Sequence, residues 1–256
     1  DLFFFRGRIG IFWVVEASAV VSIFVLAFLF RKNRQLIVSR EKTKVTDFFP
    51  TYMLLLTVGL LIFASFFPNK PELTNGYICV GIFLVCVIRE LIFKRNLKGI
   101  AGAFREIDYK TLFLLVGLFI IIGGIKNAGV IDAIAQLFVK ICGNNLFLTY
   151  TTVVWFSVAI SSFIDNIPYV ATMLPVVTGM ASLMNIEPFI LYFGLLSGAT
   201  LGGNITPIGA SANIAALGIL EKNGYFVKPG QFMKISVPFT LAAVFTGYIL
   251  IWIIWA

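Results

Sequence analysis

The chain has 256 residues, of which 59% are hydrophobic and only 12% are charged. Soluble domains usually carry about 25% charged residues, so this composition excludes an ordinary soluble protein and predicts an integral membrane protein. The net charge is +8, but eleven of the twenty Lys and Arg residues lie in two loops, 31–44 and 94–110. Such clustering is typical of membrane topology signals, and we expect no nucleic-acid partner.

The residue types needed for metal or redox chemistry are scarce. The chain has no histidine, and its three cysteines form no Cys-X-X-Cys motif, which argues against zinc and redox sites. The polar stretches described below contain neither a cysteine nor a histidine to form a nucleophile–base pair. We therefore expect a protein that is not an enzyme and needs no cofactor other than a coupling ion.

Apolar segments long enough to form helices at membrane depth recur along the chain. A span needs about 20 apolar residues to cross the ~30 Å hydrocarbon core. We predict spans at 11–30, 48–67, 76–93 and 111–125, an amphipathic helix at 130–142 and a final span at 236–255.

The two basic loops, 31–44 and 94–110, flank a predicted helical hairpin whose own turn is neutral. Lys and Arg concentrate on the cytoplasmic side of a membrane, so we predict that both loops are cytoplasmic. The membrane is expected to be a prokaryotic inner membrane.

A first polar interruption, Ser-Ser-Phe-Ile-Asp-Asn-Ile-Pro at 161–168, separates the apolar runs 146–162 and 168–183. Non-helical backbone persists at membrane depth only where it is buried in protein or lines a site. Two full spans and a re-entrant hairpin (146–183) both fit these lengths, and the polar turn favours the hairpin. Asp165 or Asn166 is placed to cap the second helix, with Pro168 at its first position.

A second interruption, Leu-Gly-Gly-Asn-Ile-Thr-Pro-Ile-Gly-Ala-Ser-Ala-Asn at 201–213, lies between apolar runs that are each too short to cross. Together they predict one discontinuous helix over 187–220. Secondary transporters build ion and substrate sites from such breaks. A half-helix beginning near Ala210 would point its N–H groups into the site, an arrangement that favours an anion.

Asp165 is the acidic residue of the hairpin turn, and a carboxylate there is costly unless it is paired, hydrated or bound to a cation. It is interpreted as a Na⁺ ligand or a proton carrier, with a helix cap as the alternative. The candidate ion- or substrate-binding residues are the polar and small residues of both interruptions: Ser161, Ser162, Asp165, Asn166, Gly203, Asn204, Thr206, Gly209, Ala210, Ser211 and Asn213.

Residues 161–175 and 202–213 resemble the ion transporter superfamily, which includes arsenite permeases, NhaD-type Na⁺/H⁺ antiporters, citrate transporters and the melanosomal P-protein. The likeness is greatest to the C-terminal half of the P-protein branch. It implies two inverted repeats, a homodimer and an elevator-like mechanism. The chain would then hold the second repeat, and the N-terminal repeat would be missing.

The resemblance also implies a division of the chain and a cation site. Residues 1–30 would form a lead-in and the last helix of the preceding repeat, 31–125 the scaffold helices, and 126–256 the transport part. A candidate Na⁺ site would involve Ser161, Ser162, Asn166 and the Gly209 backbone.

Two departures from the superfamily bear on the substrate. Dicarboxylate members carry Ser-Asn-Thr at the hairpin tip and Gly-Thr-Pro-Pro-Asn in the broken helix, where this chain has 165–167 Asp-Asn-Ile and 209–213 Gly-Ala-Ser-Ala-Asn. A fixed negative charge repels a dicarboxylate. We therefore predict a secondary active transporter of an inorganic ion or small anion, coupled to Na⁺ or H⁺, with cation/proton antiport favoured. The alternatives are an arsenite or organic-anion permease of the citrate/dicarboxylate type, an intramembrane enzyme and a non-transporting scaffold.

Overall fold

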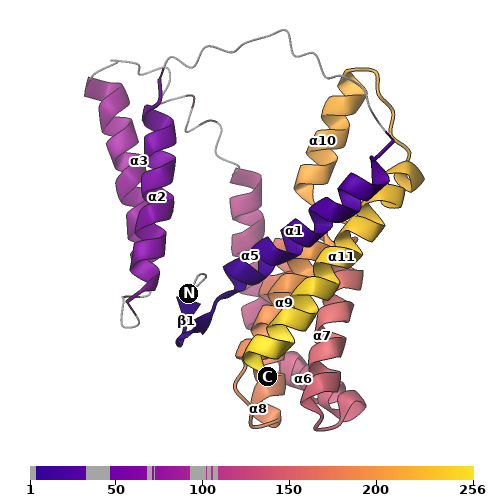
Figure 1. Cartoon of the computed structure of the whole chain (residues 1–256). Coiled ribbons are helices and arrows are strands. Elements are labelled where there is room, and N and C mark those ends of the chain that lie inside the picture. Colours follow the sequence, from indigo (N-terminus) through magenta and orange to yellow (C-terminus); the bar gives the residue numbers. More distant parts are fainter. Residues whose placement is uncertain are drawn as a thin grey trace. The chain divides into compact units, whose positions relative to one another are not determined.

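The computed structural model describes residues 4–32, 47–67, 71, 73–92, 102, 105 and 109–256, which divide into two compact units (Figure 1). Almost all regular structure in these ranges is helical. The exception is a two-residue antiparallel ladder between β1 (Phe4–Phe5) and β2 (Arg8–Ile9). The predicted fold class, an all-α polytopic membrane protein, is confirmed. Most of each basic loop lies outside the described residues, so the predicted orientation stays a prediction.

The first unit contains residues 1–10 and 35–112, and its main element is a helical hairpin. Helix α2 (Phe49–Ser65) packs against α3 (Thr74–Ile92), and both match the predicted spans to within two residues. No described residue of α3 is buried, as expected for an apolar helix that faces lipid or other protein. Near one end of the hairpin, the Arg89 guanidinium donates to both carboxylate oxygens of Asp47, at 2.9 and 3.2 Å.

The second unit contains residues 11–34 and 113–256. It holds α1 (Ile11–Leu29), α5 (Tyr109–Asn127) from Phe113 onward, α6 (Val130–Cys142), α7 (Leu146–Ser161), α8 (Asn166–Leu183), α9 (Phe189–Gly202), α10 (Ser211–Lys222) and α11 (Pro229–Trp255). Among the described helices of both units, α1, α3 and α11 are each long and apolar enough to cross a membrane. Helices α5 and α6 meet at a 72° bend and would make a fourth crossing if they form one span.

Helix α9 is the centre of the second unit. It packs against α7, α8 and α11, while α1 lies along α11 (Figure 1). Three glycines at every fourth position of α9 face α7. A Cβ atom would lie 2.8 Å from the Tyr150 ring at Gly194, 2.5 Å from the Val154 carbonyl oxygen at Gly198 and 2.7 Å from the Val158 Cα at Gly202. Small residues at this spacing let two membrane helices approach closely, so these glycines serve packing.

Two helix starts differ from the sequence expectation. The final span begins at Pro229 rather than Ser236, because proline suits the first helical position and the Gln231 side chain accepts from the Lys228 N–H at 3.0 Å. Helix α8 begins at Asn166, two residues before Pro168. A proline in the first turn removes no helical bond, since the N–H groups there have no partner within the helix. The predicted division at residues 30 and 125 stays a prediction.

Candidate functional site: the hairpin tip and the helix break

The hairpin turn is closed by the side chain of Asp165. Helix α7 ends at Ser161, and Asp165 is the N-cap of α8, with its Oδ1 accepting from the Ile167 N–H at 3.3 Å. This is the capping arrangement that the turn sequence predicts. The other carboxylate oxygen, Oδ2, is directed to a residue outside the hairpin.

The helix break runs over residues 203–210, between α9 and α10. Three of its carbonyls accept hydrogen bonds from side chains. The Asn213 Nδ2 donates to the carbonyls of Gly203 and Thr206, both at 3.0 Å, and the Ser236 hydroxyl of α11 donates to the Ile205 carbonyl at 2.7 Å. Such partners are what allows irregular backbone to persist at membrane depth. Asn213 therefore joins the first turn of α10 to the break.

Three hydrogen bonds join the tip of the hairpin to α9, the break and α10. The Ser211 hydroxyl donates to Asp165 Oδ2 at 2.5 Å, and the Thr206 hydroxyl donates to the Ser162 carbonyl. The Ser161 hydroxyl, at the end of α7, donates to the Ala199 carbonyl of α9 at 2.6 Å. The two polar interruptions that the sequence singles out therefore meet in space.

Gly209 lies where three backbone segments converge. A Cβ atom there would come within 2.5 Å of the Gly203 carbonyl oxygen and 2.7 Å of the Ser162 carbonyl oxygen. Distances below 3.0 Å force a displacement of the backbone. Glycine is therefore required at this position for the break to approach the hairpin turn.

The Asp165 carboxylate is half-buried, and within the described residues its hydrogen-bond partners are one hydroxyl and one backbone N–H. Within the described residues, neither a lysine nor an arginine forms an ion pair with it. The same part of the chain contains no group of three or more His, Cys, Asp or Glu residues that could hold a metal ion. The oxygens at this contact come instead from hydroxyls, backbone carbonyls and a single carboxylate, which suits hard cations such as Na⁺ and the proton.

The other predicted site residues occupy distinct places. Ser162 is buried and its hydroxyl donates to the Ala159 carbonyl at 2.6 Å. Asn166 is the first residue of α8, and Ala210 is the extended N-cap of α10. Asn204 faces a pocket between α10 and α11. Sequence reasoning missed Ser236, although a serine in an apolar helix is a signal that could have suggested a polar neighbour.

Comparison with known proteins places the chain in a family. A family model described as "Citrate transporter" matches residues 4–196. The chain belongs to the citrate transporter family. An uncharacterized transporter of Mycobacterium tuberculosis is 34% identical over 203 residues, which cover 77% of this chain and 45% of that protein.

Other relatives are also similar to this chain over most of its length. The P protein of Homo sapiens is 28% identical over 219 residues, covering 81% of this chain and 25% of that protein. A 46 kDa membrane protein of Mycobacterium leprae is 31% identical over 201 residues, 77% of this chain and 45% of that protein. The chain thus spans less than half the length of these curated relatives. The resemblance predicted from the two polar motifs is confirmed.

Proposed function

We propose that the protein is a secondary active transporter that exchanges a cation for protons, with Na⁺ as the first candidate for the cation. The observation that carries the proposal is Asp165, a carboxylate without a basic side-chain partner in the described part of the chain, at the contact between two helix interruptions. Its Oδ2 accepts from the Ser211 hydroxyl of α10. In this proposal Asp165 binds a proton and a cation in turn, because one carboxylate cannot hold both.

The cost of a charge at membrane depth supports this role for Asp165. An ionisable residue within a membrane-embedded segment is rare and usually functional. A helix cap alone does not need a carboxylate, since serine or asparagine caps as well. The aspartate therefore adds a charge that local structure does not require.

The cation site is proposed to draw on oxygens around Asp165. The Ser161 and Ser162 hydroxyls donate to backbone carbonyls, which leaves their oxygen lone pairs available to a cation. The Asn166 side chain and the Gly209 backbone complete the proposed set. The helix break brings the Gly209 backbone close to the two serines, because Gly209 lies against the Ser162 carbonyl.

A second candidate function is transport of citrate or another small organic anion, and the family match favours it. The anion would bind at the N-terminal turn of α10, where free N–H groups favour negative charge. The Asp165 carboxylate, which is bonded to Ser211 in that same turn, would oppose it. Arsenite export is a further proposal of the same class.

Proteoliposomes that contain the protein at its full natural length, with a pH-sensitive dye inside, test these functions. External Na⁺, Li⁺, K⁺ and citrate are stepped one at a time at constant ionic strength. Alkalinisation or acidification driven by a cation gradient alone is expected. A response to citrate with none to the three cations would instead establish the anion permease.

The assembly is proposed from the family resemblance. A homodimer, an elevator-like motion and a location in a prokaryotic inner membrane would follow from it, with the lipid bilayer and the transported ion as partners. The N-terminal repeat that the resemblance implies would supply the rest of the transport site.

A further inference from the structure

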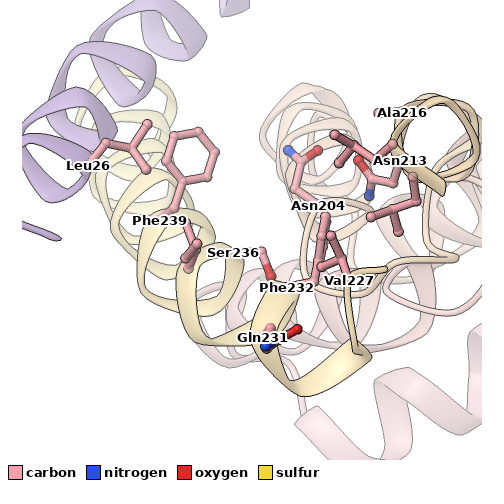
Figure 2. Close-up of a pocket in the computed structure, with 12 residues that line it drawn as sticks. Leu26, Asn204, Asn213, Ala216, Val227, Gln231, Phe232, Ser236 and Phe239 are labelled. Atoms are coloured by element: carbon pink, nitrogen blue, oxygen red, sulfur yellow. The ribbon is translucent and has the colours of Figure 1, made fainter. Parts of the chain in front are cut away.

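A pocket of about 560 Å³ lies beside the helix break, on a different side from Asp165. Its walls come from α1, the break, α10, the segment before α11, and α11 itself (Figure 2). Ser211, which bonds to Asp165, and Asn213, which lines the pocket, are two residues apart and so face opposite sides of α10. The pocket and Asp165 therefore lie on opposite sides of α10.

The pocket has an apolar body and a polar part. Figure 2 shows Asn204 and Asn213 across the pocket from Leu26 and Phe239, with Gln231 and Ser236 on α11. The remaining lining residues are apolar: Ala216, Leu217, Leu220, Val227, Phe232 and Ile235. The volume is within the ~300–1,000 Å³ range of small-molecule sites, and no charged side chain lines it. This chemistry fits a hydrocarbon chain with a polar group at one end.

The pocket lies at the end of a membrane helix. The 27 residues of α11 rise about 40 Å, which exceeds the ~30 Å hydrocarbon core. The C-terminal end carries Trp252 and Trp255, which suit a membrane interface. The N-terminal turns, which hold Gln231 and begin beside Val227, then reach the headgroup layer at the other interface.

Three exposed lysines flank the lining residues at this end. Lys222 is the last residue of α10, Lys228 is the N-cap of α11, and Lys234 lies between the lining residues Phe232 and Ile235. Glu221 is the exposed acid beside them, which leaves a net charge of +2 over residues 221–234. Basic groups next to an apolar pocket at the headgroup layer are complementary to an anionic phospholipid.

We propose that this pocket binds an anionic phospholipid. One acyl chain occupies the apolar body between α10 and α11, and the phosphate lies at Lys222, Lys228 and Lys234. Because α10 follows the break directly, an occupied pocket holds α10 against α11. The proposal does not depend on which ion is transported.

The test measures lipid retention by native mass spectrometry on the full-length protein, after exchange into phosphatidylglycerol or phosphatidylcholine. Ala216→Phe fills the pocket, and Ala215→Phe is its matched control, because Ala215 is exposed on the same helix and does not line the pocket. Wild type and Ala215→Phe are expected to retain phosphatidylglycerol in preference to phosphatidylcholine. Ala216→Phe is expected to lose it.

The headgroup contacts are tested by paired surface substitutions that do not disturb packing. Lys222→Gln with Lys228→Gln is expected to lower phosphatidylglycerol retention roughly tenfold. The control pair, Lys126→Gln with Lys140→Gln, neutralises two exposed lysines elsewhere in the second unit and is expected to change nothing. Equal retention of both lipids by wild type, equal loss in the two lysine pairs, or no bound lipid because other protein fills the pocket would each overturn the proposal.

Discussion

The two helical hairpins of the chain each contain an aspartate beside a turn or helix start, and the two aspartates differ in their partners. Asp47, before α2, forms an ion pair with Arg89 at 2.9 Å, and the Arg89 guanidinium also lies 4.0 Å from the centre of the Phe49 ring. Asp165, before α8, instead accepts a hydrogen bond from the Ser211 hydroxyl of α10. The first charge is neutralised by the protein. The second has no basic partner within the described residues, and this difference supports the proposal that the hairpin tip is the functional one.

Removal of the carboxylate at the hairpin tip has the largest expected effect. In Asp165→Asn the side chain still caps α8, so the fold is expected to be retained, while cation-driven proton movement falls to the level of protein-free liposomes. Asp132→Asn, in the exposed first turn of α6, is the matched control and is expected to transport normally. Normal transport by Asp165→Asn would reduce Asp165 to a helix cap.

The close approach of the break to the hairpin gives the next largest effect. Gly209→Ala introduces a Cβ within 3.0 Å of two carbonyl oxygens. We expect transport to be nearly lost and the protein to be destabilised by about 1–3 kcal/mol, the usual cost of overpacking. Gly218→Ala, on α10 with open space around it, is the control. Equal melting temperatures and equal transport in the two variants would show that the contact between the break and the hairpin turn has room for a Cβ atom at position 209.

The bond between α10 and the hairpin tip is expected to matter less than the carboxylate itself. Ser211→Ala removes one donor to a charged acceptor, worth ~1.5–3 kcal/mol. The apparent affinity for the driving cation should fall roughly 10- to 100-fold, with the maximal rate less affected. Ser182→Ala, an exposed serine of α8, should leave the affinity unchanged. Equal cation affinity in Ser211→Ala and Ser182→Ala would show that the Ser211 hydroxyl of α10 does not contribute to the ion site.

The neutralised aspartate of the first hairpin gives the smallest expected effect. Arg89→Gln breaks the Asp47–Arg89 ion pair, in which the Asp47 side chain is 29% exposed and the Arg89 side chain 25% exposed. Partly exposed pairs contribute ~0–1 kcal/mol, so the melting temperature should drop slightly and transport should continue. Loss of transport in Arg89→Gln with an unchanged melting temperature would contradict the contrast between the two hairpins.

Much of the site could be predicted from sequence because polar residues in an apolar chain must find partners. Asp165 at the α8 cap and the start of α10 after Ala210 both follow from local pattern. The Ser236–Ile205 bond and the packing of α1 on α11 do not, since they join segments far apart in the chain. The start of α11 is hard to predict, because Pro229, Gly230, Gln231 and Lys234 are typical of a loop, although a proline also suits the first position of a helix.

We propose that Asp165 itself binds the proton and the cation. Infrared difference spectroscopy of the full-length protein in lipid measures this directly, by exchange of Na⁺ for choline at constant pH. Direct binding by Asp165 predicts a carboxylate difference band that is present in wild type and in Asp132→Asn and absent in Asp165→Asn. A band that persists unchanged in Asp165→Asn would contradict the claim and place the ion site elsewhere in the protein.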